Sequence, residues 1–422
     1  MSAPLPSYDE AAALVAASAA QIPAPSCVEQ VELAAAAGRV LAAPLLADRD
    51  QPAFARSTRD GFACRAADAA SHAWLRVAGS TRAGEVPAAP LAYGAAWEIM
   101  TGAPVPAGAD GVIMLEHVDA DGGSVRLQAA RTLDAGENIV ARGAQARAGD
   151  ELLAAGCLIG AAQIALAAAC GAAQLDVYPK PRVAILATGD ELVPVEAEPA
   201  PGQIRNSNAP MLAALVAAHG GEPWVLPTAA DLPDSIDAAL AQAAAADLLL
   251  ITGGVSAGKF DLVEPALLKR GARFHFTGAR IQPGRPVVFG EVPSPAAALN
   301  QDRGRTQRCF GLPGNPVSSA VTFLLFAAPV LAALAGRRNL QAGGCGPRFA
   351  LARLKESVKS KSGLTRFFPA ACTFGAELPA VTRIAWQGSG DLAAMARANC
   401  FLVVPEACDS LDAGAIVRIL LA

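Results

Sequence analysis

The sequence predicts a multidomain α/β protein, in which a domain with a mostly parallel sheet accompanies helical and β-rich parts. The chain has 422 residues, enough for about two to four domains. Between residues 181 and 336, short apolar strands alternate with helical segments, which is typical of βαβ units. On either side of this stretch, short apolar pieces separated by Gly, Pro and Asp predict small β-rich domains.

Composition excludes several classes of protein. The chain is 53% hydrophobic with a net charge of −4, whereas disordered chains combine low hydrophobicity with high net charge. The 34 basic and 38 acidic residues leave no basic excess for binding a nucleic-acid backbone. The nine cysteines contain no Cys-x-x-Cys pair, which favours free thiols over disulfides or a zinc site. No signal peptide is evident in the first residues, so we expect a cytoplasmic protein.

The N-terminal third predicts helices around a β-rich insert. Ser7-Tyr8-Asp9-Glu10 opens one helix and Ser26 another, within residues 1–47. Residues 48–140 predict a β-rich domain with strands near 74–77 and 111–115. Residues 150–175 return to a helical pattern.

The stretch from residue 181 predicts the parallel sheet. In chain order we expect a strand at 182–187, a helix at 208–219, a strand at 224–226, a helix at 234–246, a strand at 247–252, a helix at 261–270, strands near 287–289 and 309–311, and a helix at 317–335. Residues 291–308 predict a loop. The last helix is long enough to cross a membrane, but the turn before it and Pro329 favour a buried core helix. After residue 347 the pattern predicts a further small β domain.

Acidic residues follow three of the predicted strands. Glu191 follows the first, Asp231 the second and Asp261 the third. Open α/β sheets bind ligands at the carboxyl ends of their strands, so we expect these acids at one edge. Carboxylates and phosphate oxygens hold Mg²⁺, and this favours a ligand site. For a single acid, above all Asp261, a helix N-cap is the alternative.

A glycine-rich loop at 253–261 follows the third strand and opens a helix. Its glycines would let the backbone approach an anion, as in a phosphate-binding loop. Phe260 stands where a P-loop has its magnesium-binding hydroxyl, which argues against an NTPase. A plain tight turn is the alternative. A G-x-G-x-x-A match at 388–393 lacks the βαβ unit of a dinucleotide site, so we reject that interpretation.

Nine sequence pieces, in this order, resemble the molybdopterin molybdenumtransferase family, the bacterial MoeA type, which is similar to the E domain of gephyrin. The pieces are P-x4-S-x2-D-G-F-A (52–63), I-M-T-G-A-P-V-P (99–106), E-N-I (137–139), T-G-D-E-L (188–192), G-Q-I-R-N-S-N (202–208), G-G-V-S-x-G-x-x-D (253–261), P-G-R-P (283–286), F-G-L-P-G-N-P-V-S (310–318) and Q-G-S-G-x-L (387–392). They cover almost the whole chain.

The resemblance implies an elongated homodimer of four-domain subunits with the active cleft between subunits. The implied domains are a helical central domain (1–47 plus 141–180), an inserted β-rich domain (48–140), an α/β molybdopterin-binding domain (181–336) and a C-terminal β-barrel-like domain (337–422). The family's reaction takes adenylylated molybdopterin and molybdate, uses Mg²⁺, and yields molybdenum cofactor and AMP. A molybdopterin adenylyltransferase and molybdoenzyme apo-proteins are the implied partners, with no nucleic acid and no membrane.

The resemblance also implies roles for the matched residues. Asp60 and Thr101 would contact substrate from the β-rich domain, and Glu191, Asp231 and Asp261 would place Mg²⁺ and the pyrophosphate. The remaining implied substrate-binding residues are Gly253, Gly254, Ser256, Gly258, Arg285, Pro313, Pro316, Ser318, Arg366 and Ser389.

Two departures from the family pattern concern cations. The family usually has Lys-Pro-Gly-Lys-Pro where this chain has Gln282-Pro283-Gly284-Arg285-Pro286. Leu364 replaces an Arg of the C-terminal region, and Arg366 is the expected substitute. Because molybdate is a dianion, these changes motivate an alternative: a non-catalytic paralogue that binds or carries molybdopterin or the finished cofactor. A sugar-phosphate or nucleotide enzyme on a similar sheet is a more remote alternative.

Overall fold

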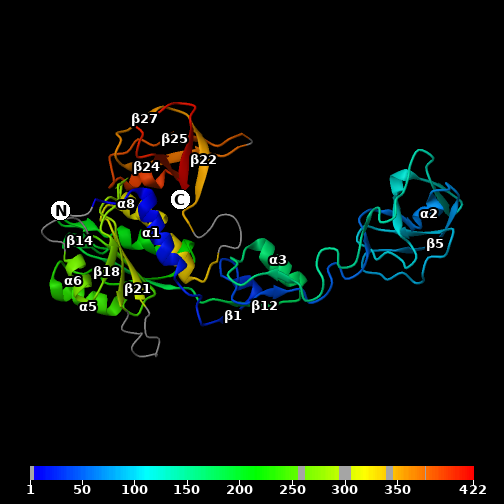
Figure 1. Cartoon of the computed structure of the whole chain (residues 1–422), viewed down its shortest axis with the longest axis horizontal. Helices are drawn as coiled ribbons and strands as arrows, with labels where there is room; N and C mark the ends of the chain where they lie inside the picture. Colours follow the sequence, from blue (N-terminus) through cyan, green and yellow to red (C-terminus); the bar gives the residue numbers. More distant parts are fainter. Residues whose placement is uncertain (1–3, 255–261, 294–305, 339–345, 376) are drawn as a thin grey trace. The chain divides into compact units, whose positions relative to one another are not determined.

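A computed structural model of the chain describes residues 4–254, 262–293, 306–338, 346–375 and 377–422. The chain divides into two compact units (Figure 1). Unit 1 comprises Met1–Ala42, Ala155–Gly160 and Leu175–Ala422. Unit 2 comprises Ala43–Ala154 and Ala161–Gln174. The boundaries of the four predicted domains stay predictions.

A six-stranded mixed sheet forms the centre of unit 1. Its order is β16 (Glu222–Val225), β13 (Arg182–Ala187), β17 (Leu248–Thr252), β21 (Thr306–Leu312), β20 (Val288–Pro293) and β18 (Arg273–Phe276). The first four strands are parallel, and the last two are antiparallel to their neighbours. In register, Ile185 pairs with Val225 on one side and with Leu250 on the other. The parallel strands therefore end together at one edge.

Helices cover both faces of this sheet. The helices of unit 1 that pack against it are α1 (Tyr8–Ala20), α4 (Asn208–Ala218), α5 (Pro233–Ala243), α6 (Val263–Lys269), α8 (Pro316–Thr322) and α9 (Ala328–Leu334), with the π-helical turn η3 (Phe323–Ala327) between the last two. Alternate strand residues explain the two layers. Ile185 belongs to the core formed with α1, α4, α8 and α9, whereas Leu186 belongs to the core formed with α5 and α6.

The helix Pro316–Leu334 is long and apolar enough to cross a membrane by length and composition. Inside the fold, 83% of its most apolar window is buried. Phe323 and Phe326 are fully buried beside Tyr8 of α1 in the larger core. This is the packing of a core helix in the described part of the chain.

A small closed barrel lies C-terminal to the sheet. Its strands are β22 (Phe349–Leu354), β24 (Thr365–Thr373), β25 (Ala380–Arg383), β26 (Cys400–Val404) and β28 (Ile416–Leu421), and a pairing of β24 with β26 closes the ring. The short elements β23 (Val358–Lys359), β27 (Ser410–Leu411) and α10 (Leu392–Ala396) accompany it. The short strand β19 (Ile281–Gln282) extends from the α/β part and pairs in parallel with β24.

Unit 2 holds a second six-stranded sheet. Its order is β7 (Gly111–Met114), β4 (Gly61–Cys64), β6 (Ala95–Ile99), β5 (Leu75–Thr81), β9 (Ser124–Leu127) and β8 (Val118–Asp121). The remaining elements of the unit are β2 (Leu45–Leu46), β3 (Arg56–Ser57), α2 (Ala66–Ala69), η2 (Leu115–His117), β10 (Ile139–Val140), β11 (Glu151–Leu153) and α3 (Ala161–Ala169). The strands expected near 74–77 and 111–115 are confirmed.

Three local predictions are wrong or need shortening. No helix begins at Ser26, because the following residues form β1 (Glu29–Glu32) and the short 3₁₀ turn η1 (Leu33–Ala35), and β1 pairs with β12 (Gln174–Val177). Within 150–175 only α3 is helical, and the rest is strand and turn. The loop predicted over 291–308 is too long, because β20 continues to Pro293 and β21 begins at Thr306.

Candidate functional site

The loops that follow the four parallel strands are hydrogen-bonded to one another. The Thr188 N–H donates to Thr252 O at 3.0 Å, and the Gly189 N–H donates to Ala229 O at 3.3 Å. The Gly253 N–H donates to Leu312 O at 3.4 Å. These bonds join the ends of β16, β13, β17 and β21 into one continuous edge.

Acidic side chains gather at the β16–β13 end of this edge. The Asp231 N–H donates to Asp190 Oδ1 at 3.0 Å. Partial burial, and then the negative charges of Asp190 and Glu191, raise the pKa of Asp231. The structure thus brings Glu191 and Asp231 into electrostatic contact. Among the residues it describes, no three His, Cys, Asp or Glu side chains are arranged to hold a metal by themselves.

Gly253 and Gly254 pass directly over Thr188. Both have positive φ, +92° and +60°. A Cβ on Gly253 would collide with Thr188 O, and one on Gly254 would lie 2.8 Å from Thr188 Oγ1. The Thr188 hydroxyl beneath them is buried and has no hydrogen-bond partner among the residues that the structure describes. Only glycines fit this close approach. Ser256, Gly258 and Asp261, which were predicted to continue the site, lie outside the described residues.

Asn208, the first residue of α4, is a site residue that sequence reasoning missed. Its Nδ2 donates to Thr252 Oγ1 at 2.8 Å and to Gly314 O at 2.6 Å, which ties the ends of β17 and β21 together. Its Oδ1 is buried and accepts no hydrogen bond from any part of the chain that the structure describes. The sequence offered one signal: Asn208 ends the motif at 202–208 and stands at a predicted helix start.

The turn from β21 to α8 is rigid and connects to the C-terminal region. Pro313 is buried, and Pro316 is the first residue of α8. Asn315 Nδ2 donates to Ser389 Oγ at 2.8 Å, and the Val317 N–H donates to Ser389 O at 3.0 Å. Ser318, one residue further, is 3% exposed. Pro313, Pro316, Ser318 and Ser389 are therefore brought together at the start of the long helix.

The segment Gln282–Pro286 packs against the same helix. Pro283 and Gly284 are buried, and a Cβ on Gly284 would lie 2.5 Å from Thr322 Cγ2. The Arg285 side chain is exposed, and no described residue pairs with its guanidinium. This leaves Arg285 as a cation at the surface of the site.

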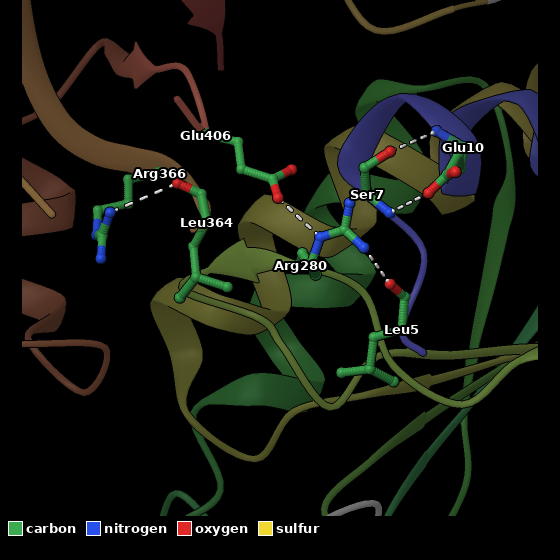
Figure 2. Close-up of polar contacts among 7 residues, drawn as sticks. All are labelled: Leu5, Ser7, Glu10, Arg280, Leu364, Arg366 and Glu406. Carbon is green, nitrogen blue, oxygen red and sulfur yellow. Dashed lines mark hydrogen bonds and ion pairs between the residues drawn. The ribbon is translucent and has the colours of Figure 1, made fainter. Parts of the chain in front are cut away.

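Arg366 is held inside the protein. It is 9% exposed, its Nε donates to Gln282 Oε1 at 2.8 Å, and its Nη1 donates to Ser360 Oγ at 3.1 Å. A longer contact joins Nη1 to Leu364 O (Figure 2). Arg366 is thus mostly committed to protein acceptors, and its role toward substrate stays a prediction.

In unit 2, Asp60 and Thr101 form a hydrogen-bonded pair. Asp60 Oδ1 accepts the Thr101 N–H at 2.6 Å and the Thr101 hydroxyl at 2.8 Å. These bonds, the backbone one foremost, lower the pKa of Asp60. Gly61 packs so tightly that any Cβ would collide with Ile113 O. The Thr58 N–H donates to Asn138 O at 2.9 Å, so three motif pieces of this unit meet around Asp60.

Comparisons with family models match three parts of the chain. Residues 6–171 match the MoeA N-terminal region (domain I and II). Residues 184–333 match the probable molybdopterin binding domain, and residues 351–422 match the MoeA C-terminal region (domain IV).

Curated relatives and solved structures agree with these matches. A molybdopterin molybdenumtransferase of Nostoc is 36% identical over 79% of this chain and 75% of the relative. One from Bacillus subtilis is 33% identical over 93% of this chain and 89% of the relative. A crystal structure of a molybdopterin biosynthesis MoeA protein from Pyrococcus horikoshii OT3 has a TM-score of 0.79 at 29% identity, covering 99% of this chain and all of that one.

Proposed function

The chain belongs to the MoeA family of molybdopterin molybdenumtransferases, and we propose that it inserts molybdenum from molybdate into adenylylated molybdopterin with Mg²⁺-dependent release of AMP. One observation carries the proposal. The joined ends of four parallel strands present carboxylates at one end and a double-glycine turn beside them. Such an edge is where an open α/β sheet binds a ligand.

The donor set at the acidic end suits Mg²⁺. Carboxylate oxygens from Glu191 and Asp231 are the ligand type this ion prefers, and it commonly takes one or two of them together with substrate phosphates. Burial and then repulsion by Asp190 and Glu191 raise the pKa of Asp231, and a cation would relieve the repulsion. When bound, Mg²⁺ would neutralise charge on the pyrophosphate and orient it. Asp261 is part of this proposal as a third carboxylate.

The glycine turn and Arg285 would receive the anions. At Gly253 and Gly254 no side chain stands between backbone and ligand, which suits a phosphate group. Ser256 and Gly258 would extend this cradle. Arg285 offers a fork of N–H donors to molybdate, and the Ser389 hydroxyl would approach the same anion. Pro313, Pro316 and Ser318 would shape the wall.

Asp60 and Thr101 would act on the substrate from unit 2. An aspartate is ionised at neutral pH, and the hydrogen bonds from Thr101 favour the ionised form further by lowering the pKa of Asp60. As an acceptor fixed by Thr101, it can orient a donor group of the substrate. The proposal includes a cytoplasmic homodimer that exchanges substrate with a molybdopterin adenylyltransferase and apo-enzymes. Light scattering should give twice the 42.7 kDa of the chain.

AMP release tests the reaction. Purified protein receives adenylylated molybdopterin, Mg²⁺ and molybdate, and AMP is followed by chromatography. We expect turnover that stops without Mg²⁺ and is impaired in Glu191→Gln but retained in Glu196→Gln, an exposed glutamate outside the site. Tight pterin binding without AMP release would instead support a carrier. Failure to bind any pterin would favour a different phosphate-ester enzyme.

A further inference from the structure

Arg280 joins three segments of unit 1 that are distant in sequence. Its side-chain Nη1 donates to Leu5 O at 2.7 Å, and its backbone N–H donates to Pro6 O at 2.8 Å. Its Nε donates to Glu406 Oε1 at 2.8 Å, between β26 and β27. Figure 2 shows the guanidinium between the Leu5 carbonyl and the Glu406 carboxylate. One residue thereby fastens the N-terminal segment and the barrel to the entry of β19.

The contacts of Arg280 continue into the barrel and the start of α1. Its carbonyl accepts the Thr365 N–H at 3.0 Å, next to the pairing of β19 with β24. Ser7, two residues beyond Leu5, caps α1 and is bonded reciprocally to Glu10 (Figure 2). The N-terminal segment that Arg280 holds is therefore itself anchored on a helix of the main core.

The residues beside Arg280 fix the backbone of Arg285. The Ala279 N–H donates to Arg285 O at 3.0 Å. A Cβ on Gly278 would lie 2.9 Å from Leu5 Cδ2 and 3.2 Å from Arg285 O, so Leu5 and the Arg285 carbonyl pack on the same glycine. Residues 278–285 thus form a loop that the Ala279–Arg285 bond closes, and Arg280 lies next to this closing bond in the chain.

We propose that Arg280 is a positioning residue, which sets the backbone of Arg285 so that its free guanidinium meets the incoming oxyanion. The inference rests on the proposed function, because Arg285 is assigned there to molybdate. The Arg280–Glu406 pair is partly exposed, with side chains of 37% and 32% exposure, and its 2.8 Å contact is a charge-assisted hydrogen bond. No described residue pairs with the Arg285 guanidinium, so the backbone alone fixes the point from which this side chain extends.

Loss of Arg280 should affect anion capture more than chemistry. Small displacements of a positioning group weaken binding steeply, and we expect Arg280→Ala to raise the KM for molybdate about 10-fold. The kcat and the KM for adenylylated molybdopterin should stay within about twofold, since the acidic end and the glycine turn are untouched. Arg280→Lys keeps a charge for Glu406 but lacks the second donor, and it should give an intermediate value.

The test is a double-mutant cycle on AMP release with molybdate varied. If Arg280 acts through Arg285, the double variant Arg280→Ala/Arg285→Ala has the same molybdate KM as Arg285→Ala alone. The matched control is Arg39→Ala, since Arg39 also bridges a carboxylate (Glu29) and a carbonyl (Tyr178 O, 2.9 Å) in unit 1. This control should leave both KM values unchanged.

Additive effects, or equal changes in both KM values, would overturn the positioning role while leaving the proposed function intact. A wild-type protein that releases no AMP would overturn the function itself. Should Arg280→Ala fail to fold, Glu406→Gln serves in its place, because it keeps an acceptor and removes only the charge. It should raise the molybdate KM about threefold, and no rise would contradict the proposal.

Discussion

Substitution of Gly253 by alanine tests how the edge of the sheet is built. Alanine would have to adopt φ near +92°, which costs about 1–2 kcal/mol for an L-residue. Its methyl would also collide with the backbone oxygen of Thr188 and lie 3.1 Å from the Thr188 hydroxyl. Relief of this overlap by separating the ends of β13 and β17 adds about 1–3 kcal/mol. We expect a total loss of about 2–5 kcal/mol.

Gly414→Ala is the matched control. Gly414 lies in the same unit with φ +87°, and a Cβ there would have nothing within 4 Å. Gly414→Ala should therefore lose only the about 1–2 kcal/mol that a positive φ costs an L-residue, with no added cost from a collision. Both variants are unfolded in urea at equilibrium. If the two m-values match, the difference between their free energies of unfolding is the cost of the collision. AMP release should fall about 100-fold in Gly253→Ala, because the phosphate turn is displaced, and persist in Gly414→Ala.

Equal destabilisation by the two alanines would refute this reasoning. It would mean that the overlap with Thr188 is relieved without cost and that the strand ends are not in firm contact. Normal AMP release in a destabilised Gly253→Ala would refute the assignment of the turn to substrate, even with the packing argument intact.

Three further predictions concern charge. The Asp231→Asn variant should be more stable to unfolding than wild type at neutral pH. The pKa of Asp231 is raised in the folded protein, so wild type loses stability as the pH rises from 3.8 through the pKa of the folded state, and Asn carries no charge to cause this loss. Urea unfolding should show the difference vanishing below pH 3.8, and a less stable Asn variant at neutral pH would contradict it. Thr101→Val removes one of the two hydrogen bonds that lower the pKa of Asp60, so the acid limb of the pH profile of AMP release should move to higher pH. An acid limb that does not move would argue against a role of ionised Asp60 in the reaction. Gln282→Lys should lower the free energy of unfolding in urea by about 1–3 kcal/mol, because it removes the acceptor of the Arg366 Nε–H. Gln282→Glu keeps that acceptor and should not destabilise the protein. Equal effects of the two substitutions would show that the lost hydrogen bond is not the cause.

The sequence predicted the central sheet well because its strands carry their own signal. Residues 182–187 and 248–252 are apolar runs bounded by turn residues, and such runs form buried parallel strands wherever helices can cover them. The strands β2, β3, β10 and β11, of two or three residues each, have no such pattern. They exist because a partner strand lies beside them, and no local window contains that partner.

The residues of the candidate site differ in the same way, because some follow from local patterns and others depend on contacts that are distant in sequence. The proximity of Glu191 and Asp231 could be predicted, because strand ends in a parallel sheet meet at one edge whatever the side chains. Asn208 could not, because its importance lies in a bond to Gly314, 106 residues away. The sequence could show that Arg366 is a cation, but not that its guanidinium is bonded to Gln282, which lies 84 residues earlier.

That partner changes how the departures from the family pattern are understood. A glutamine can accept the Nε–H of Arg366, whereas a lysine only donates and would set a second cation beside a guanidinium that is 9% exposed. Gln282 and Arg366 therefore form one hydrogen-bonded pair, in which a neutral amide suits the buried guanidinium. Because Arg366 is engaged inside the protein, the proposed function assigns anion capture at this loop to Arg285, which is exposed. The proposed function has molybdate received by Arg285, so the placement of this guanidinium matters for binding, and this is why the anchoring of its backbone through Arg280 should be visible in the molybdate KM.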